Sequence, residues 1–91
     1  MYSKNIKLLW LPAEQGTYRA AVVVSKKVHK SAVVRNRIRR RLYEITRNAL
    51  KGHEKAPDLI YIVQNPVLAT QSTADVQAEV LDLLKKIPNM L

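Results

Sequence analysis

The sequence contains no cysteine and no phenylalanine, it has only two glycines, and aromatic residues make up 5% of it. Without cysteine the chain forms neither disulfides nor thiolate metal sites, which is typical of a reducing compartment, so we expect a cytoplasmic location. The two glycines, Gly16 and Gly52, are too few for a glycine-rich phosphate loop. The longest purely apolar run, Ala20 to Val24, is too short to cross a bilayer. The amino terminus also lacks the charged-then-apolar order of a secretory signal.

The chain has a strong and localised positive charge. Its 91 residues predict one small domain, and an apolar content of 47% allows a modest core. Sixteen Lys and Arg against seven Asp and Glu leave a formal charge of +9. The segment from Lys26 to Lys51 holds ten basic residues and a single acid, Glu44, so this segment alone accounts for the net charge. Such a concentration indicates a docking surface for a polyanion.

Three apolar segments predict strands. The first runs from about Asn5 to Leu11, and residues 12–17 form a turn of hairpin length. The second, Tyr18 to Ser25, is continuously apolar in its middle, as in a strand covered on both faces. We expect these two strands to form an antiparallel hairpin. The third strand is Leu59 to Val63.

The basic segment predicts a long helix. Ser31 is placed to cap its start, and Gly52 is placed to end it in the left-handed conformation. At about 100° per residue, one narrow arc collects the apolar residues Val34, Ile38, Leu42, Ile45 and Ala49. The opposite side carries Asn36, Arg40, Tyr43 and Arg47, flanked by Arg35 and Arg39 on one side and by Arg37 on the other. Arg41 lies nearer the apolar edge, and we expect its guanidinium to reach solvent.

A second helix completes the predicted fold. It begins at Ser72 or Thr73 and stops at Pro88, and its apolar face contains Val76, Val80, Leu83, Leu84 and Ile87. The element order is therefore β-β-α-β-α. Two strands joined through the basic helix favour a parallel crossover. We expect an α+β fold, a two-layer sandwich that forms a single domain over residues 1–91.

The side chains do not predict a protein active site. Phosphodiester hydrolysis usually needs clustered carboxylates that hold metal, or a histidine with an acid–base partner. Asp75, Glu79 and Asp82 share one side of the last helix, and we interpret them as its solvated side. His29 and His53 have no predictable partner. We therefore expect the protein to bind neither metal nor cofactor.

Nucleic acid is the favoured partner of the basic helix. Arginine presents a planar fork of donors that matches phosphate oxygens. A membrane surface is disfavoured, because the apolar arc is narrow and is needed to cover the sheet. Charge alone leaves RNA and DNA open, although no short helix precedes the basic one as in a helix-turn-helix. Tyr43 fits base stacking or ribose contact, whereas Trp10 fits packing on the sheet better.

Two motifs resemble the signature of the bacterial ribonuclease P protein family. The string SKKV at residues 25–28 is followed by AVVRNRIRR at residues 32–40. Members of this family carry Ser-Lys-Lys at the end of a strand and Arg-Asn-Arg-Ile-Lys/Arg-Arg on the helix after it. DLIYIV at residues 58–63 is similar to the family's next strand. The resemblance covers most of the chain from about Trp10 onward, and the two motifs at this spacing are specific.

The resemblance implies both a fold and a function. The fold is similar to the second domain of ribosomal protein S5, with a left-handed β-α-β crossover that departs from the general right-handed preference. The implied function is that of the protein subunit of ribonuclease P, which assists a catalytic RNA in removing the 5′ leader from precursor tRNA. The ribonuclease P RNA holds the magnesium and performs the cleavage. The alternative is a generic RNA-binding or ribosome-associated protein with the same fold.

The resemblance also implies a set of RNA-binding residues. The family positions are matched by Lys26, Lys27, Arg35, Asn36, Arg37, Arg39 and Arg40. The basic side chains are expected to clamp phosphates, and Asn36 to bond a sugar or backbone group or to order the preceding loop. To these we add three residues of the same basic segment, Lys30, Tyr43 and Arg47.

The chain departs from the family pattern in three ways. Members usually begin with a helix whose two phenylalanines line the leader-binding cleft, and we expect that helix to be shortened or absent here. Trp10 is then the candidate aromatic of the leader cleft. Tyr43 stands where the family often has arginine, and Asn65 precedes Pro66 where Arg-Pro is common. Both changes remove charge from the expected RNA face.

Overall fold

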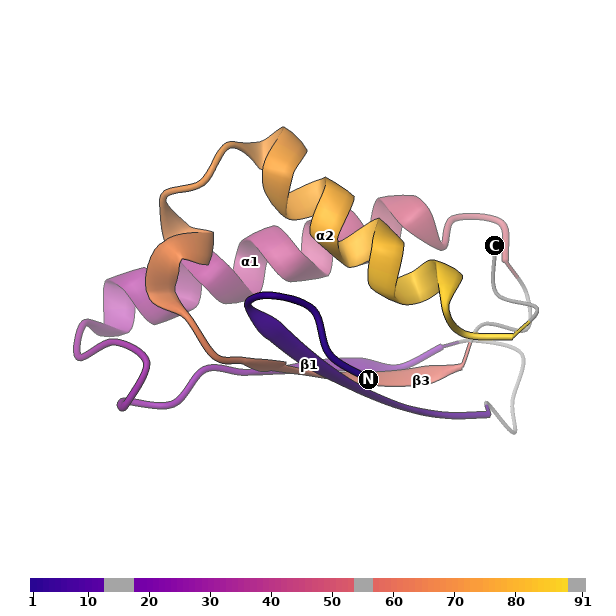
Figure 1. The fold of residues 1–91 in the computed structure, drawn as a ribbon, viewed down its shortest axis with the longest axis horizontal. Coiled ribbons are helices and arrows are strands. Elements are labelled where there is room, and N and C mark those ends of the chain that lie inside the picture. Colours follow the sequence, from indigo (N-terminus) through magenta and orange to yellow (C-terminus); the bar gives the residue numbers. More distant parts are fainter. Residues whose placement is uncertain (13–17, 54–56, 89–91) are drawn as a thin grey trace.

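The computed structural model describes residues 1–12, 18–53 and 57–88, and in this part of the chain two helices cover one face of a three-stranded sheet (Figure 1). The predicted α+β class and the order β-β-α-β-α are confirmed, with one short 3₁₀ helix, η1, that the sequence pattern did not predict. In chain order the elements are β1 (Ile6–Leu11), β2 (Ala20–Val23), α1 (Ala32–Ala49), β3 (Asp58–Val63), η1 (Pro66–Ala69) and α2 (Thr73–Lys85).

The strand order is β1-β3-β2, so the predicted hairpin between the first two strands is wrong. β3 lies between them, antiparallel to β1 and parallel to β2, and its Tyr61 is opposite both Leu8 and Val22. The central position suits β3, because a central strand has both of its backbone edges paired and the five residues Leu59 to Val63 are all apolar. Of the turn predicted at residues 12–17, residues 13–17 lie outside the described part of the chain.

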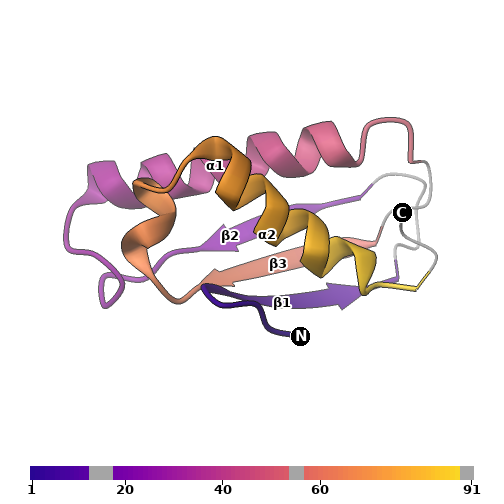
Figure 2. The ribbon, with the colours of Figure 1, turned by 45° about the horizontal axis from the view of Figure 1, so that its top comes forward.

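The parallel connection from β2 through α1 to β3 has the left-handed crossover that the resemblance implies. In Figure 2 the helices lie in front of the sheet, the arrows of β2 and β3 both point to the left, and β2 lies above β3. When the arrows are turned to point upward, the chain therefore moves to the left as it passes from β2 to β3. A right-handed connection, the usual one, would move to the right.

The prediction that the second strand is covered on both faces is wrong. Val22 and Val24 are buried, whereas Ala21 and Val23, which alternate with them, are exposed. The reason is that α1 and α2 both lie on the same side of the sheet (Figure 1). The other face is open to solvent and carries the exposed aliphatic side chains of Leu9, Leu11, Val23 and Ile60.

The long helix α1 begins and ends as its sequence predicts. The Ser31 side chain accepts a hydrogen bond from the Val34 amide, and Gly52, two residues beyond the C-cap Leu50, has a φ of +86°. Non-glycine residues rarely adopt this left-handed conformation. The predicted apolar arc is confirmed: Ile38, Leu42 and Ile45 are buried, and Val34 and Ala49 pack against the core at either end.

The last helix, α2, is capped by Ser72, whose hydroxyl accepts from the amide of Asp75. The predicted apolar residues Val76, Val80, Leu83, Leu84 and Ile87 are all buried, although α2 ends at Lys85, earlier than the predicted stop at Pro88, so that Ile87 lies just beyond the helix. They meet the α1 arc over the covered face of the sheet, which contributes Ile6, Leu8, Val22, Leu59, Tyr61 and Val63. The core thus lies between the two layers and fixes how far each helix can rotate about its axis.

Glu79 is not part of a solvated side of α2, which corrects the sequence-based interpretation. Its carboxylate accepts hydrogen bonds from the backbone amide of Asn5 at 2.8 Å, the side-chain amide of Asn5 at 2.8 Å and the hydroxyl of Ser3. The partners lie more than 70 residues away in sequence, at the start of β1. Asp75 and Asp82 are exposed as expected, and Glu79 instead joins the first strand to the helix layer.

One hydroxyl pair is buried in the core. The Thr46 hydroxyl on α1 donates to the Tyr61 hydroxyl on β3 at 2.8 Å. Burial raises the pKa of Tyr61 to about 12, against the opposing effect of the Thr46 hydrogen bond. The tyrosinate therefore forms far less readily in the folded protein than in the unfolded chain.

Alkaline pH is expected to destabilise the fold through Tyr61. Between pH 10 and pH 12 the unfolded chain releases the tyrosine proton and the folded protein keeps it, so rising pH favours unfolding, by about 2–3 kcal/mol across this range. Urea unfolding at pH 9, 10, 11 and 12 measures the change, with the Tyr61→Phe variant as control. An equal loss of stability in both proteins would contradict the assignment to Tyr61.

Candidate nucleic-acid interface

The lysines of the SKKV motif lie on a turn between β2 and α1. The Val28 amide donates to the Ser25 carbonyl at 3.0 Å, so Lys26 and Lys27 occupy the two central positions of a turn, and both are exposed. Further along, the Ser31 amide donates to Nδ1 of His29 at 3.0 Å. His29 therefore has a structural contact that the sequence did not predict, and it connects the turn to the cap of α1.

Three arginines extend into solvent from the outward side of α1. Arg37, Arg40 and Arg47 are exposed, and none of them hydrogen-bonds to another described residue. The helix rises about 1.5 Å per residue, so these guanidinium groups are distributed over roughly 15 Å of its length. That spacing lets them contact several phosphates of one nucleic-acid backbone.

Arg39 and Asn36 form a pair that is directed toward the sheet. Nη1 of Arg39 donates to Oδ1 of Asn36 at 2.7 Å, and Nη2 donates to the carbonyl of Val24 at 3.3 Å. The Asn36 carbonyl thus orients an arginine, and the predicted role of ordering the preceding loop is not observed. A guanidinium has five donors, so Arg39 retains donors for an external anion while its position is restrained.

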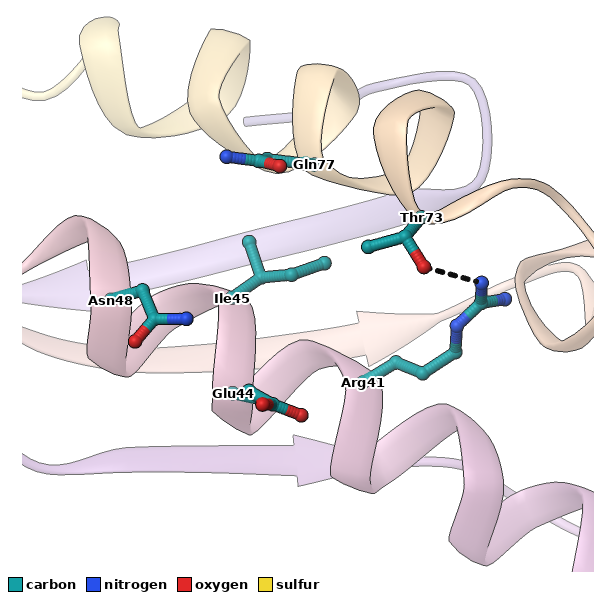
Figure 3. A pocket seen from close by; sticks show the side chains of 6 residues that line it. All are labelled: Arg41, Glu44, Ile45, Asn48, Thr73 and Gln77. Carbon is teal, nitrogen blue, oxygen red and sulfur yellow. Dashed lines mark hydrogen bonds between the residues drawn. The ribbon is translucent and has the colours of Figure 1, made fainter.

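Arg41 does not extend into solvent, contrary to the sequence-based prediction. Its Nη1 donates to the Leu68 carbonyl in η1 at 2.8 Å, and its Nη2 donates to the Thr73 hydroxyl at the start of α2 at 3.3 Å (Figure 3). These partners lie 27 and 32 residues further along the chain, so no local pattern could indicate them. Arg39 and Arg41 thus anchor opposite flanks of α1, one to Val24 just after β2 and the other to η1 and α2.

Arg35 has a donor that its described surroundings do not satisfy. The side chain is half-buried, and its Nε is buried with no hydrogen-bond partner among the described residues. A buried donor without a partner costs about 1–3 kcal/mol. A phosphate oxygen bound beside α1 would supply the missing acceptor.

Tyr43 contacts the free edge of the sheet. Its hydroxyl accepts a hydrogen bond from the Val22 amide at 3.2 Å, so it satisfies a backbone donor on the unpaired side of β2. Tyr43 is 42% exposed and lines a surface depression together with Val33, Asn36, Arg39 and Arg40. The hydroxyl oxygen is therefore engaged as an acceptor, whereas the hydroxyl proton and the exposed part of the side chain remain for a ligand.

The positive charge of α1 is not compensated by carboxylates. Between described residues the one salt bridge joins Arg19 to Asp58 at 2.9 Å, away from α1, and this contact holds the pKa of Asp58 below its usual value. No described Asp or Glu lies within 4.0 Å of a basic group on α1. Lys30, Lys51 and the outward arginines are also exposed. The predicted residues thus lie on the SKKV turn, in the short segment after it and on α1, and together they are hereafter called the basic surface: Lys26, Lys27, Lys30, Arg35, Asn36, Arg37, Arg39, Arg40, Tyr43 and Arg47.

Trp10 lies apart from this basic surface. It is near the end of β1, opposite Leu59, and it is half-buried against the core on the face of the sheet that the helices cover.

The described residues contain no group of three His, Asp or Glu side chains that could hold a metal ion. Among the described helices, none is both long and apolar enough to span a membrane.

The fold is that of solved ribonuclease P proteins. The RNase P protein of Staphylococcus aureus matches with a TM-score of 0.80 and 25% identity, over 100% of this chain and 82% of that protein. The RNase P protein of Thermotoga maritima matches with a TM-score of 0.83 and 23% identity, over 98% of this chain and 83% of the other. The fold therefore defines the class, an α+β domain of the bacterial ribonuclease P protein type.

The sequence comparisons identify the family. The family model described as ribonuclease P matches residues 1–88, and the chain belongs to this family. The ribonuclease P protein component of Thermus scotoductus is 40% identical over 84 residues, which are 90% of this chain and 45% of that protein. The protein component of Thermus aquaticus is 39% identical over 83 residues, 89% of this chain and 46% of that one. The chain thus spans about half the length of the curated relatives it matches.

Proposed function

We propose that this chain acts as the protein component of ribonuclease P, in which it binds the catalytic RNA and assists removal of the 5′ leader from precursor tRNA. Membership of the family supports this function. The observation that carries it is the uncompensated charge of α1, whose arginines have no described carboxylate within 4.0 Å. A fixed row of cations without internal partners is an arrangement for binding an external polyanion.

The family resemblance implies a division of work between the protein and the RNA. The basic surface supplies donors for phosphate oxygens, with Lys26 and Lys27 reaching from the turn and the arginines from α1. Arg39 and Arg35 bind from restrained positions, which lowers the entropy lost on binding. The RNA partner holds the magnesium and performs the cleavage, and the site of this work is the cytoplasm.

A cleavage assay at low magnesium tests the function. The full chain is added to ribonuclease P RNA from a Thermus species, and the removal of the leader from a precursor tRNA is followed. We expect the protein to increase the rate at magnesium concentrations where the RNA alone is slow, and the protein without RNA to leave the precursor intact. Unchanged cleavage together with intact RNA binding would mean a generic RNA-binding protein instead.

Trp10 supplies a second measurement, on the leader itself. It is the only tryptophan of the chain, and its ring remains partly accessible at the end of β1. We propose that the leader passes close to it, so its fluorescence should change more with precursor tRNA than with mature tRNA in the complete complex. Identical spectra with the two tRNAs would contradict a leader contact at Trp10.

A further inference from the structure

A polar groove lies between α1 and α2, beside the basic surface. Its volume is about 310 Å³, at the lower end of the range of small-molecule sites. Figure 3 shows that α1 contributes Arg41, Glu44, Ile45 and Asn48, and α2 contributes Thr73 and Gln77. The α1 residues follow the i, i+3, i+4, i+7 spacing of one helix face, and the α2 residues are one turn apart. The groove is therefore a regular feature of two packed helices.

Glu44 is the unusual member of this groove. It is the only acid of the basic segment Lys26 to Lys51, and it has Arg40 and Arg41 on the preceding turn and Arg47 on the next. Despite these neighbours it forms no salt bridge or hydrogen bond with any described residue, and it is exposed. An unpaired carboxylate on a helix that binds phosphates weakens that binding by repulsion, unless it accepts hydrogen bonds from the ligand.

The other polar groups of the groove are suited to the same ligand. The amides of Asn48 and Gln77 both donate and accept, and the buried Ile45 provides an apolar floor between them. Arg41 is held at one end by Leu68 and Thr73 and keeps unused donors. A flat ring with hydrogen-bonding groups along one edge fits this combination, and an unstacked nucleobase has that chemistry.

Guanine matches the carboxylate better than the other bases do. Its N1–H and its exocyclic amino group are adjacent donors, which pair with the two oxygens of one carboxylate, while its O6 accepts from an amide or guanidinium. Adenine offers no such pair of donors, and inosine lacks the amino group. We infer that this groove binds an unpaired guanosine of the RNA partner, with Glu44 as the residue that selects the base. This inference rests on the proposed function, because it assigns a base-reading role beside the RNA-binding surface.

Binding of short RNA probes tests the inference. Four single-stranded adenosine hexamers are used, unmodified or with one internal guanosine, inosine or cytidine, and dissociation constants are measured by fluorescence anisotropy. We expect the guanosine hexamer to bind about tenfold more tightly than the adenosine hexamer, with inosine between them. The side-chain amide signals of Asn48 and Gln77 should shift in NMR spectra with the guanosine probe only.

Two variants with the same change of charge complete the test. Glu44→Gln should abolish the preference for guanosine, whereas Asp82→Asn, on an exposed position of α2 outside the groove, should retain it. If the wild type binds all four hexamers equally and with a steep salt dependence, the groove inference fails and the RNA-binding function stands. A wild type that binds none of the hexamers and no ribonuclease P RNA would overturn both. A preference that survives in Glu44→Gln would overturn the role of this residue.

Discussion

Replacing Ile38 by alanine is expected to lower the free energy of unfolding by about 2–5 kcal/mol. Ile38 is completely buried and is the central apolar residue in the first half of α1. Its side chain lies in the core between the helices and the sheet, so the substitution removes apolar contacts and leaves a cavity. In a domain of this size the loss is a large part of the total stability. Urea denaturation at neutral pH, followed by circular dichroism, measures it.

The matched control is Val33→Ala on the same helix. Val33 is 74% exposed, so its loss should change stability by less than about 0.5 kcal/mol. Each folded variant is also tested for RNA binding. If Ile38→Ala kept full stability and lost RNA affinity instead, the buried and exposed sides of α1 would be the reverse of those described here.

The second large effect is expected on RNA affinity. The triple variant Arg37→Ala, Arg40→Ala, Arg47→Ala removes the three exposed guanidinium groups that have no partners among the described residues. If each contacts one phosphate, the slope of log K against log salt should decrease by roughly two to three, and affinity at 0.1 M salt should fall by roughly 10²-fold. Filter binding of ribonuclease P RNA at several salt concentrations measures both quantities.

A control for total charge is available elsewhere on the molecule. The triple variant Lys4→Ala, Lys85→Ala, Lys86→Ala also removes three exposed cations, none of them on α1 or the SKKV turn. We expect its salt slope to remain close to that of the wild type. Equal losses in the two triple variants would show that net charge, and not the position of the arginines on α1, determines binding.

Much of the interface could be predicted because its signals are local. The 3.6-residue repeat of Val34, Ile38 and Leu42 defined which side of α1 is buried, and hence that Arg40 and Arg47 face outward. Ser31 and Gly52 defined the ends of this helix for reasons of capping and backbone conformation. The RNA-binding role of the individual residues remains a prediction that the variants above will test.

The anchoring contacts could not be predicted because their partners are distant in the chain. Arg41 was expected in solvent and instead bonds to Leu68 and Thr73, and Glu79 was expected in solvent and instead bonds to Asn5. Tyr43 was predicted only as a ligand contact, and its hydroxyl also accepts a hydrogen bond from the Val22 amide. In each case a polar side chain forms a hydrogen bond with a group that is distant in the chain. Only the packing of separate elements brings the two groups together.

By itself the sequence determined the α+β class, the succession of strands and helices, and the concentration of charge on one helix, because each depends on residues close together in the chain. Only the tertiary structure decided that β3 pairs with both other strands and that one sheet face stays open, and it confirmed the left-handed crossover that the family resemblance implies. Those features depend on which apolar surfaces pack together. A strand carries the same alternation of side chains whichever neighbour it pairs with, so pairing and handedness cannot be determined from the local sequence.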